Sequence, residues 1–308
     1  MEFEFNSRRS QLSDLHDVLR SLDFSIDDNF EPQPLRGLSN RNYVVRQNEE
    51  MHVVRVACEQ AERFGMSREA EGEVLQLASD AGLGAEVVRY ALPEGHLITK
   101  LLPSEGVGQD PATFETPEML RRVTEGVKRI HELPAIGHEF APIGRIREAF
   151  RRAEESRASL PDGYKHLLRQ LDEVEEYRGP LKPEHTALCH NDLFGGNVLD
   201  SDPIRFIDWE FAGMGDIFFD LGTLVVCCDE ASPLPEDARS LILETYFGRV
   251  EPDHVRRLSD MVFVAQLHVV AWGLTHHVMG TSSQGWEGFT FLGFATDLLE
   301  HLMAEITR

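Results

Sequence analysis

Polar side chains with the functional groups of a catalytic or metal site are concentrated in one short stretch of this 308-residue chain. Residues 189–213 read CHNDLFGGNVLDSDPIRFIDWEFAG, and their polar members include His190, Asp192, Asn197, Asp208 and Glu210. A carboxylate such as Asp192 can take a proton from a hydroxyl, while oxygens of Asn197 and Asp208 suit Mg²⁺. These groups are what phosphoryl transfer from a nucleotide requires. The stretch therefore predicts a phosphoryl-transfer site, and the alternative is a surface hairpin whose acidic groups are merely solvated.

The second half of this stretch predicts how its polar groups come together. VLDSDPIRFID, residues 198–208, has the pattern of two short strands joined by an Asp-Pro turn. Because adjacent strands lie about 5 Å apart, the hairpin would bring Asn197 and Asp208 together at its open end. Gly195 and Gly196 allow a turn just before Asn197. We expect this hairpin as the one sheet-like island in a mainly helical region.

The rest of the chain predicts two different lobes. An amphipathic helix is expected over 7–22, and hairpins are expected over 42–58 and 86–102. Between the hairpins we expect a helix that begins after Ser67 and ends just before Gly82. Later helices are expected at 117–133, 145–158, 163–177, 216–229, 236–248, 253–279 and 290–306. We therefore predict an α+β fold with a small antiparallel-sheet lobe, 1–102, and a mainly helical lobe, 103–308. Small-molecule sites tend to lie in clefts between such lobes.

The motif order resembles a known superfamily. H-x-D-x-x-x-x-N followed by I-D resembles the catalytic and metal loops of protein-kinase-like enzymes. The longer text HNDLFGGNVL…IRFIDWEFAGMGDIFFDLG resembles the aminoglycoside phosphotransferase and choline/ethanolamine kinase branch. The resemblance implies Asp192 as catalytic base, Asn197 and Asp208 as Mg²⁺ ligands, and ATP as co-substrate. It implies Asp220 as a buried acceptor that braces the catalytic loop, and His190 as a packing and hydrogen-bonding residue.

The first lobe resembles the nucleotide-binding half of the same branch. RGLSNRNYVV resembles its G-G-L-T-N-x-N-Y turn, in which small polar groups approach the phosphates, and the matching positions are Gly37, Ser39, Asn40 and Asn42. Arg55 in HVVRVAC is the candidate for the strand cation, where protein kinases use Lys. Its expected partner on the next helix is Glu71, which shares a face with Val74, Leu75 and Ala78. The alternative for Arg55 is a solvent-facing strand arginine.

Two further segments resemble parts of the superfamily. HLITKLLP resembles the strand that links the lobes and receives the adenine on its backbone, which implies Lys100 and Leu101 at the nucleotide. VTEGVKRIHELP resembles a recurring helix that ends in L-H, where His131 is expected in the core.

The acceptor site is less well specified. Recognition of a quaternary ammonium requires aromatic faces and a nearby carboxylate. Trp272 matches the first aromatic of the choline-kinase W-G-L segment, but Thr275 stands where a second Trp is expected and Cys227 where an acid is common. The candidate lining residues are Glu210, Trp272, Trp286 and Phe289, each of which could instead be plain core. Choline or ethanolamine is the leading candidate for the acceptor. The alternatives are an aminoglycoside, thiamine or another amino alcohol.

Composition narrows the partners. A net charge of −23 disfavours nucleic acid and anionic membranes, and is compatible with a cationic substrate or with adaptation to high salt. The first residues lack a secretory signal, and Gln266 and His268 break the longest apolar region, so no membrane insertion is expected. The four cysteines have no CxxC pair and are expected to be reduced, in a cytoplasmic protein. The sequence is compatible with a homodimer.

The sequence disfavours three other functions. A protein kinase is disfavoured because the short distance between Asp208 and Asp220 leaves no room for a long activation segment. A catalytically silent nucleotide-binding module would usually have lost Asp192, Asn197 or Asp208, and all three are present. A metal hydrolase built on His190 and Asp208 lacks a second His in the stretch.

Overall fold

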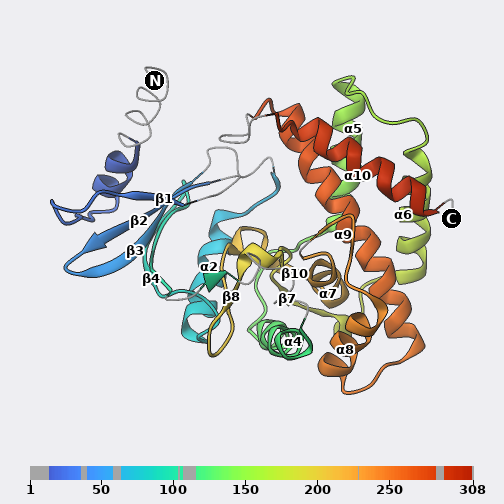
Figure 1. Cartoon of the computed structure of the whole chain (residues 1–308), viewed down its shortest axis with the longest axis horizontal. Helices are drawn as coiled ribbons and strands as arrows, with labels where there is room; N and C mark the ends of the chain where they lie inside the picture. Colours follow the sequence, from blue (N-terminus) through green and yellow to red (C-terminus); the bar gives the residue numbers. More distant parts are fainter. Residues whose placement is uncertain are drawn as a thin grey trace. The chain divides into compact units, whose positions relative to one another are not determined.

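The computed structural model describes residues 14–35, 40–57, 64–102, 105–106, 116–227, 229–281 and 288–306. The chain divides into two compact units, Met1–Pro103 and Ser104–Arg308 (Figure 1). A small antiparallel sheet dominates the first unit and helices dominate the second. The predicted two-lobed α+β fold is confirmed.

Unit 1 contains a five-stranded antiparallel sheet in the order β1-β2-β3-β5-β4. Its strands are β1 (Gln33–Leu35), β2 (Arg41–Gln47), β3 (Glu50–Val56), β4 (Val87–Ala91) and β5 (His96–Lys100). Asn48 and Glu49 form the turn between β2 and β3, and both have positive φ, as the favoured two-residue hairpin turn requires. Strand β1 contains a proline. Pro34 is tolerated in it because β1 is an edge strand.

Alternation along the sheet determines which side chains meet which helix. Val54 and Val56 of β3 face the helix at residues 14–21, whose apolar side chains share one buried cluster with them. Arg55 therefore faces the opposite side, toward α2 (Arg68–Asp80). The predicted N-cap of α2 is confirmed, because the Ser67 side chain accepts a hydrogen bond from the Ala70 amide. The sheet thus aims Arg55 at a helix that carries acidic residues.

The seven predicted helices of unit 2 are confirmed, with ends that differ from the prediction by a few residues. They are α4 (Pro117–His131), α5 (Pro142–Glu155), α6 (Lys165–Arg178), α7 (Ile217–Val225), α8 (Glu236–Phe247), α9 (Pro252–Val278) and α10 (Phe291–Ile306).

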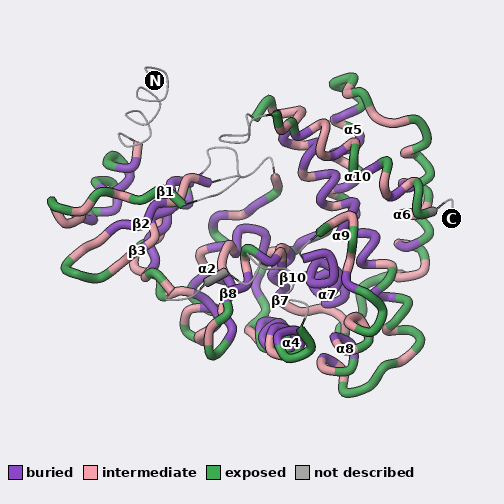
Figure 2. Tube along the Cα trace, in the orientation of Figure 1, coloured by how far each residue is buried: buried purple, intermediate pink, exposed green. Residues whose placement is uncertain are grey.

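Helix α9 is the centre of unit 2 and packs against α5, α7 and α10. Its length and composition alone would allow it to cross a membrane, but 72% of its most apolar window is buried, as in a core helix. Figure 2 shows α7 buried along its whole length. Its backbone approaches α9 closely at Gly222, where a Cβ would lie 2.6 Å from the carbonyl oxygen of Met261.

Two small sheets position residues 189–213. The predicted hairpin is present as β8 (Val198–Asp200) and β9 (Arg205–Phe206), with β6 (Glu105–Gly106) added to β8. The expectation of a single sheet-like island was wrong, because β7 (Thr186–Cys189) pairs with β10 (Gly213–Asp216) in a second sheet. The β10 sequence GMGD has the composition of a turn, and its pairing depends on a partner distant in sequence. This pairing brings the two ends of the segment 190–212 together.

Candidate active site

The loop after β7 positions Asp192 and Asn197. Asp192 is half-buried, and the short helix η4 (Gly195–Asn197) turns the chain back toward it. The side-chain Nδ2 of Asn197 donates to both the carboxylate Oδ2 and the backbone oxygen of Asp192, each at 2.9 Å. Because Nδ2 makes both bonds, the amide oxygen Oδ1 is the atom that would ligate a metal.

The β8–β9 hairpin positions Asp208. Val198 pairs with Phe206, and the next bond along the hairpin runs from the Ile207 amide to the carbonyl oxygen of Asn197, at 3.0 Å. Asp208 follows in the left-handed region, with φ of 65°, which Asp adopts more readily than most residues. It is half-buried and begins the short helix η5 (Trp209–Phe211), which carries the buried Glu210.

Three carboxylates share this part of unit 2. Burial, and then the negative charges of Asp208 and Glu210, raise the pKa of Asp192 well above its ordinary value, and the bond from Asn197 opposes the rise. A bound cation stabilises such a group of carboxylates. The oxygens of Asp208 and Asn197 are the hard ligands that Mg²⁺ prefers, so the residues present fit this metal.

His190 and Asp220 lie beneath the loop. The Nε2 atom of His190 is 3.0 Å from the carbonyl oxygen of Ile207, and its ring packs against Trp209 at 4.5 Å between centroids. Burial lowers the pKa of His190 to about 4, so the imidazole is neutral near pH 7. The fully buried Asp220 accepts the backbone N–H groups of His190, at 2.8 Å, and Asn191, at 2.6 Å.

Asn191, which the sequence analysis did not single out, also holds the loop. It is buried, has φ of 65°, and donates from Nδ2 to the carbonyl oxygen of Phe211 at 3.0 Å. This bond ties the loop after β7 to η5. The signal for it was the residue type, since Asn is enriched in left-handed backbone.

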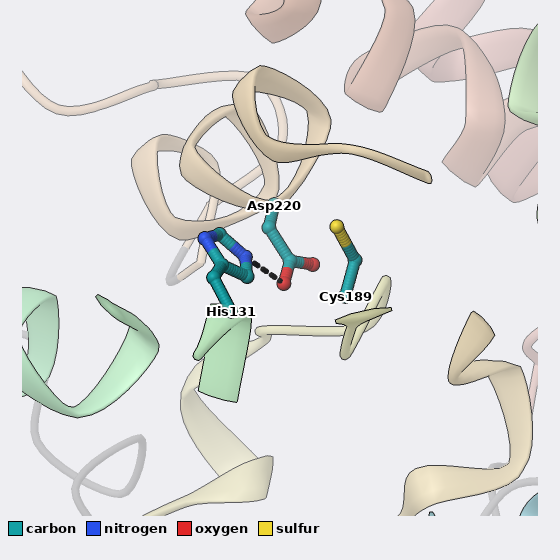
Figure 3. A group of neighbouring side chains, drawn as sticks. All are labelled: His131, Cys189 and Asp220. Carbon is teal, nitrogen blue, oxygen red and sulfur yellow. Dashed lines mark hydrogen bonds and ion pairs between the residues drawn. The ribbon is translucent and has the colours of Figure 1, made fainter. Parts of the chain in front are cut away.

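His131 lies at the end of α4, and its side chain is 3% exposed. Figure 3 shows its imidazole beside Asp220 and the thiol of Cys189. The donor atoms of the three residues lie within 4.8 Å of one another, an arrangement that could hold a metal ion. However, the Asp220 oxygens already accept two backbone N–H groups, and burial raises the pKa of the Cys189 thiol well above its ordinary value. A protonated thiol is a poor metal ligand, so we interpret this group as a hydrogen-bonded support of the loop.

In unit 1 the predicted pair of Arg55 and Glu71 is in contact, with Nη1 of Arg55 2.5 Å from Oε1 of Glu71. Both residues are buried, and Nη2 of Arg55 donates to the carbonyl oxygen of Gly95 at 2.9 Å. The alternative of a solvent-facing strand arginine is therefore wrong. The sheet turns Arg55 inward, where Glu71 compensates its charge.

Arg68 and Tyr90 complete this network and were missed from the sequence. Arg68 donates to Oε2 of Glu71 at 2.7 Å, and the Tyr90 hydroxyl donates to the same oxygen at 2.8 Å. Burial alone would raise the pKa of Glu71, but the charges and hydrogen bonds of Arg55 and Arg68 hold it below its ordinary value. The spacing of Arg68 three residues before Glu71 was the available signal.

The other predicted nucleotide residues also lie in unit 1. Asn40 is buried, Asn42 lies opposite Arg55 in the β2–β3 register, and Ser39 with Gly37 lies outside the described residues. At the end of β5 the amide of Lys100 donates to the Glu86 carbonyl at 3.0 Å and that of Leu101 to the Met51 carbonyl at 2.9 Å. The backbone amides at these two positions are therefore already paired within unit 1.

The predicted acceptor residues fall into two groups. Trp272 and Phe289 are half-buried members of one aromatic cluster, in which both rings contact Phe291 (5.3 Å for each) and Phe294. Glu210 belongs instead to η5. His268, one helical turn before Trp272 on α9, has its ring 6.3 Å from that of Phe211, the residue after Glu210. Trp286 lies outside the described residues.

Comparison with known sequences finds one matching family. The model of the phosphotransferase enzyme family matches residues 32–257, a range that includes Arg55, Asp192 and Asp208 but ends before Trp272. Protein LicA of Haemophilus influenzae is 26% identical over 196 residues, 61% of this chain and 69% of that protein. A second LicA sequence from this species is 26% identical over 226 residues. The matches span about two thirds of the length of these relatives.

Solved structures agree in fold. A choline/ethanolamine kinase family protein from Mesorhizobium loti superposes with a TM-score of 0.74 at 23% identity, over 91% of this chain and 89% of that chain. Choline kinase LicA from Streptococcus pneumoniae gives a TM-score of 0.71 at 16% identity, over 96% and 99%. At these identities the likeness establishes a kinase-like fold.

Proposed function

The chain belongs to the phosphotransferase enzyme family, and we propose that it transfers the γ-phosphate of ATP to a hydroxyl of a small amino alcohol. The observation that carries this proposal is the pair of hydrogen bonds from Asn197 to Asp192. They fix a carboxylate beside an amide oxygen and beside Asp208, which is the donor set of phosphoryl transfer. We further infer that the enzyme acts in the cytoplasm.

Asp192 is the proposed catalytic base. Its carboxylate is held on one side by Asn197, and its raised pKa makes it a stronger proton acceptor than an ordinary Asp. In the proposed reaction it takes the proton of the acceptor hydroxyl as the oxygen attacks phosphorus and the bond to ADP breaks. Asn197 and Asp208 would hold Mg²⁺, which when bound neutralises charge on the phosphate oxygens.

The unit 1 network is the proposed anchor of the nucleotide. Arg55 carries a charge that phosphates attract. Glu71 and Gly95 fix the direction of its guanidinium, and Arg68 in turn holds Glu71. A guanidinium that is already oriented loses less entropy when it binds phosphate. Ser39, Asn40 and Asn42 would approach the phosphates, while Lys100 and Leu101 would meet the adenine.

Choline or ethanolamine is the proposed acceptor. Trp272 with its aromatic neighbours offers ring faces to a cationic head group, and Glu210 offers a carboxylate. The net charge of −23 would attract such a substrate. Names of similar proteins, a choline kinase and a choline/ethanolamine kinase family protein, support the same class.

One observation favours keeping a second acceptor class. The carbonyl oxygen of Cys227 accepts the Gly195 amide at 2.9 Å, so this position adjoins the catalytic loop. A thiol there, in place of the acid common in choline kinases, removes one carboxylate from the neighbourhood of the loop. An aminoglycoside or thiamine-type alcohol therefore belongs in the acceptor panel.

The test replaces Asp192 by Asn and measures ATP-coupled turnover across choline, ethanolamine, thiamine, aminoglycosides and amino sugars. We expect kcat with the active acceptor to fall by about 10² to 10⁴-fold, the usual contribution of a general base, with the Kd of MgATP within about twofold of wild type. Asp200→Asn is the matched control, since Asp200 is exposed on the same hairpin and pairs with Arg122. Retained turnover in Asp192→Asn would refute the assignment of the base. MgATP binding by the wild type without consumption for any acceptor would instead indicate a silent module.

A further inference from the structure

The carboxylate of Asp220 receives three hydrogen-bond donors from different parts of unit 2. Two are the backbone amides of His190 and Asn191 at the start of the catalytic loop. The third is Nε2 of His131, which lies 3.0 Å from Oδ2 (Figure 3). A carboxylate can only accept, so Nε2 of His131 must carry the hydrogen.

The other nitrogen of the same imidazole meets a phenol. Nδ1 of His131 lies 2.7 Å from the hydroxyl of Tyr246, on α8. Burial, with smaller contributions from Cys189 and Asp220, raises the pKa of Tyr246, so the phenol keeps its proton. In the tautomer with hydrogen on Nε2, Nδ1 has a lone pair, and the Tyr246 O–H is the donor beside it.

The phenol is held firmly against α4. The ammonium of Lys128 donates to the Tyr246 carbonyl at 3.1 Å and lies 5.9 Å from the centre of its ring. The ring also lies 5.5 Å from that of His131 and is 9% exposed. An unbroken series of contacts therefore runs from α8, through α4 and α7, to the loop that carries Asp192.

We propose that Tyr246 is a positioning residue for the catalytic loop, because its hydroxyl fixes the His131 ring with the Nε2 hydrogen directed at Asp220. Without the hydroxyl, Nδ1 loses its donor, so the Nε2–H form becomes less favoured over the Nδ1–H form, which turns a lone pair toward the carboxylate. Asp220 would then hold the His190 and Asn191 amides less firmly, and Asp192 would lose its fixed position. The catalytic consequence rests on the proposed kinase function, whereas the structural consequence does not.

The first test uses the wild-type protein labelled with ¹⁵N-histidine. We expect the nitrogen shifts of His131 to show hydrogen on Nε2. A His131 ring with hydrogen on Nδ1 alone overturns the proposal. This measurement needs neither a substrate nor a folded variant.

The second test measures amide hydrogen exchange in Tyr246→Phe, which keeps the ring and removes only the hydroxyl. We expect the His190 and Asn191 amides to exchange at least about tenfold faster than in wild type after normalisation to the core amides of α9. Tyr177→Phe is the matched control, because it removes a hydroxyl that donates to the exposed Asp253 in the same unit. Equal acceleration in the loop and in α9 means a general loss of stability and contradicts the proposal.

The third test separates positioning from binding. With the active acceptor, we expect Tyr246→Phe to lower kcat by about 10- to 100-fold, as displaced catalytic groups do, with the KM values for ATP and acceptor changed less than about twofold. In a His131→Gln background the same substitution should have no further effect. Multiplying effects would show that Tyr246 acts independently of His131 and would overturn the proposal. If the wild type turns over no acceptor, the first two tests still decide the structural claim.

Discussion

Replacement of Gly222 by Ala tests the packing that fixes Asp220. Gly222 lies two residues after Asp220 on α7, where this helix crosses α9. A Cβ at this position would lie 2.6 Å from the carbonyl oxygen of Met261 and 2.8 Å from its carbonyl carbon, against an ordinary contact distance of at least 3.4 Å. Both obstructing atoms are backbone atoms of a buried helix, so no side chain can swing away. The two helices must separate by roughly 0.8 Å to restore ordinary contact.

Two opposing terms set the magnitude. Overpacking of a core costs about 1–3 kcal/mol, and rigid backbone neighbours place Gly222→Ala near the upper end. Ala is favoured over Gly in a helix by about 1 kcal/mol, which offsets part of that cost. The expected net loss is about 2 kcal/mol of unfolding free energy, or a fall in Tm of about 4–8 °C for a domain of this size. Because α7 carries Asp220, kcat should fall in the folded variant as well.

Urea unfolding followed by tryptophan fluorescence is a suitable assay, since Trp209, Trp272 and Trp286 all belong to unit 2. Gly144→Ala is the matched control. Gly144 is an exposed helical glycine of α5, and nothing lies within 4 Å of an added Cβ. We expect this control to leave stability unchanged or to raise it by up to about 1 kcal/mol. If Gly222→Ala is as stable as wild type, the close approach of α7 to α9 is not a constraint and the reasoning fails.

Two further substitutions test buried charge. Glu71→Gln should destabilise unit 1 by about 3–5 kcal/mol because it leaves two buried guanidiniums without their shared carboxylate. The control Glu69→Gln, on the exposed side of α2, should change stability by less than about 0.5 kcal/mol. Urea unfolding followed by circular dichroism compares the two variants, and equal effects would contradict the buried network. His276 is 2% exposed, and burial lowers its pKa from 6.5 to about 4. As pH falls through this range, His276 binds a proton in the unfolded chain but not in the folded chain, so the folded state loses stability. His276→Phe should therefore flatten the loss of stability between pH 6 and pH 4.5 by up to about 1.4 kcal/mol per pH unit, and an unchanged slope in urea titrations would refute the pKa shift.

The parts of the site that sequence could predict are local. Asp192, Asn197 and Asp208 lie on one continuous stretch, and a turn followed by a hairpin is sufficient to bring Asn197 to Asp192. The same holds for the helices of unit 2, whose apolar periodicity is long and strong. Glu71 could be chosen among three glutamates because helical spacing alone places it on the apolar face of α2.

The parts that sequence did not predict depend on contacts between distant segments. The pairing of β7 with β10 joins residues 186–189 to residues 213–216, and GMGD carries no strand pattern of its own. Tyr246 reaches His131 across more than a hundred residues, and a tyrosine in an amphipathic helix gives no sign of such a partner. Arg68 was an exception, because its spacing from Glu71 was visible. Residues that lie on other elements and support the candidate catalytic groups are therefore recognised from the structure and not from the sequence.

The candidate phosphate-transfer groups and the candidate acceptor groups lie on different elements, which affects how acceptor preference can change. The phosphate chemistry is assigned to one stretch, 190–208, whose groups are fixed by hydrogen bonds to Asn197, Ile207 and Asp220. The candidate acceptor groups lie on separate elements, Glu210 on η5 and Trp272 on α9. A substitution on α9 can change an aromatic face without disturbing any hydrogen bond that holds Asp192. The preferred acceptor can therefore change while residues 190–208 stay the same. Variants of α9 such as Trp272→Ala are the ones that test whether choline or another alcohol is the acceptor. A rise in the acceptor KM with kcat unchanged would identify this face as part of the acceptor site.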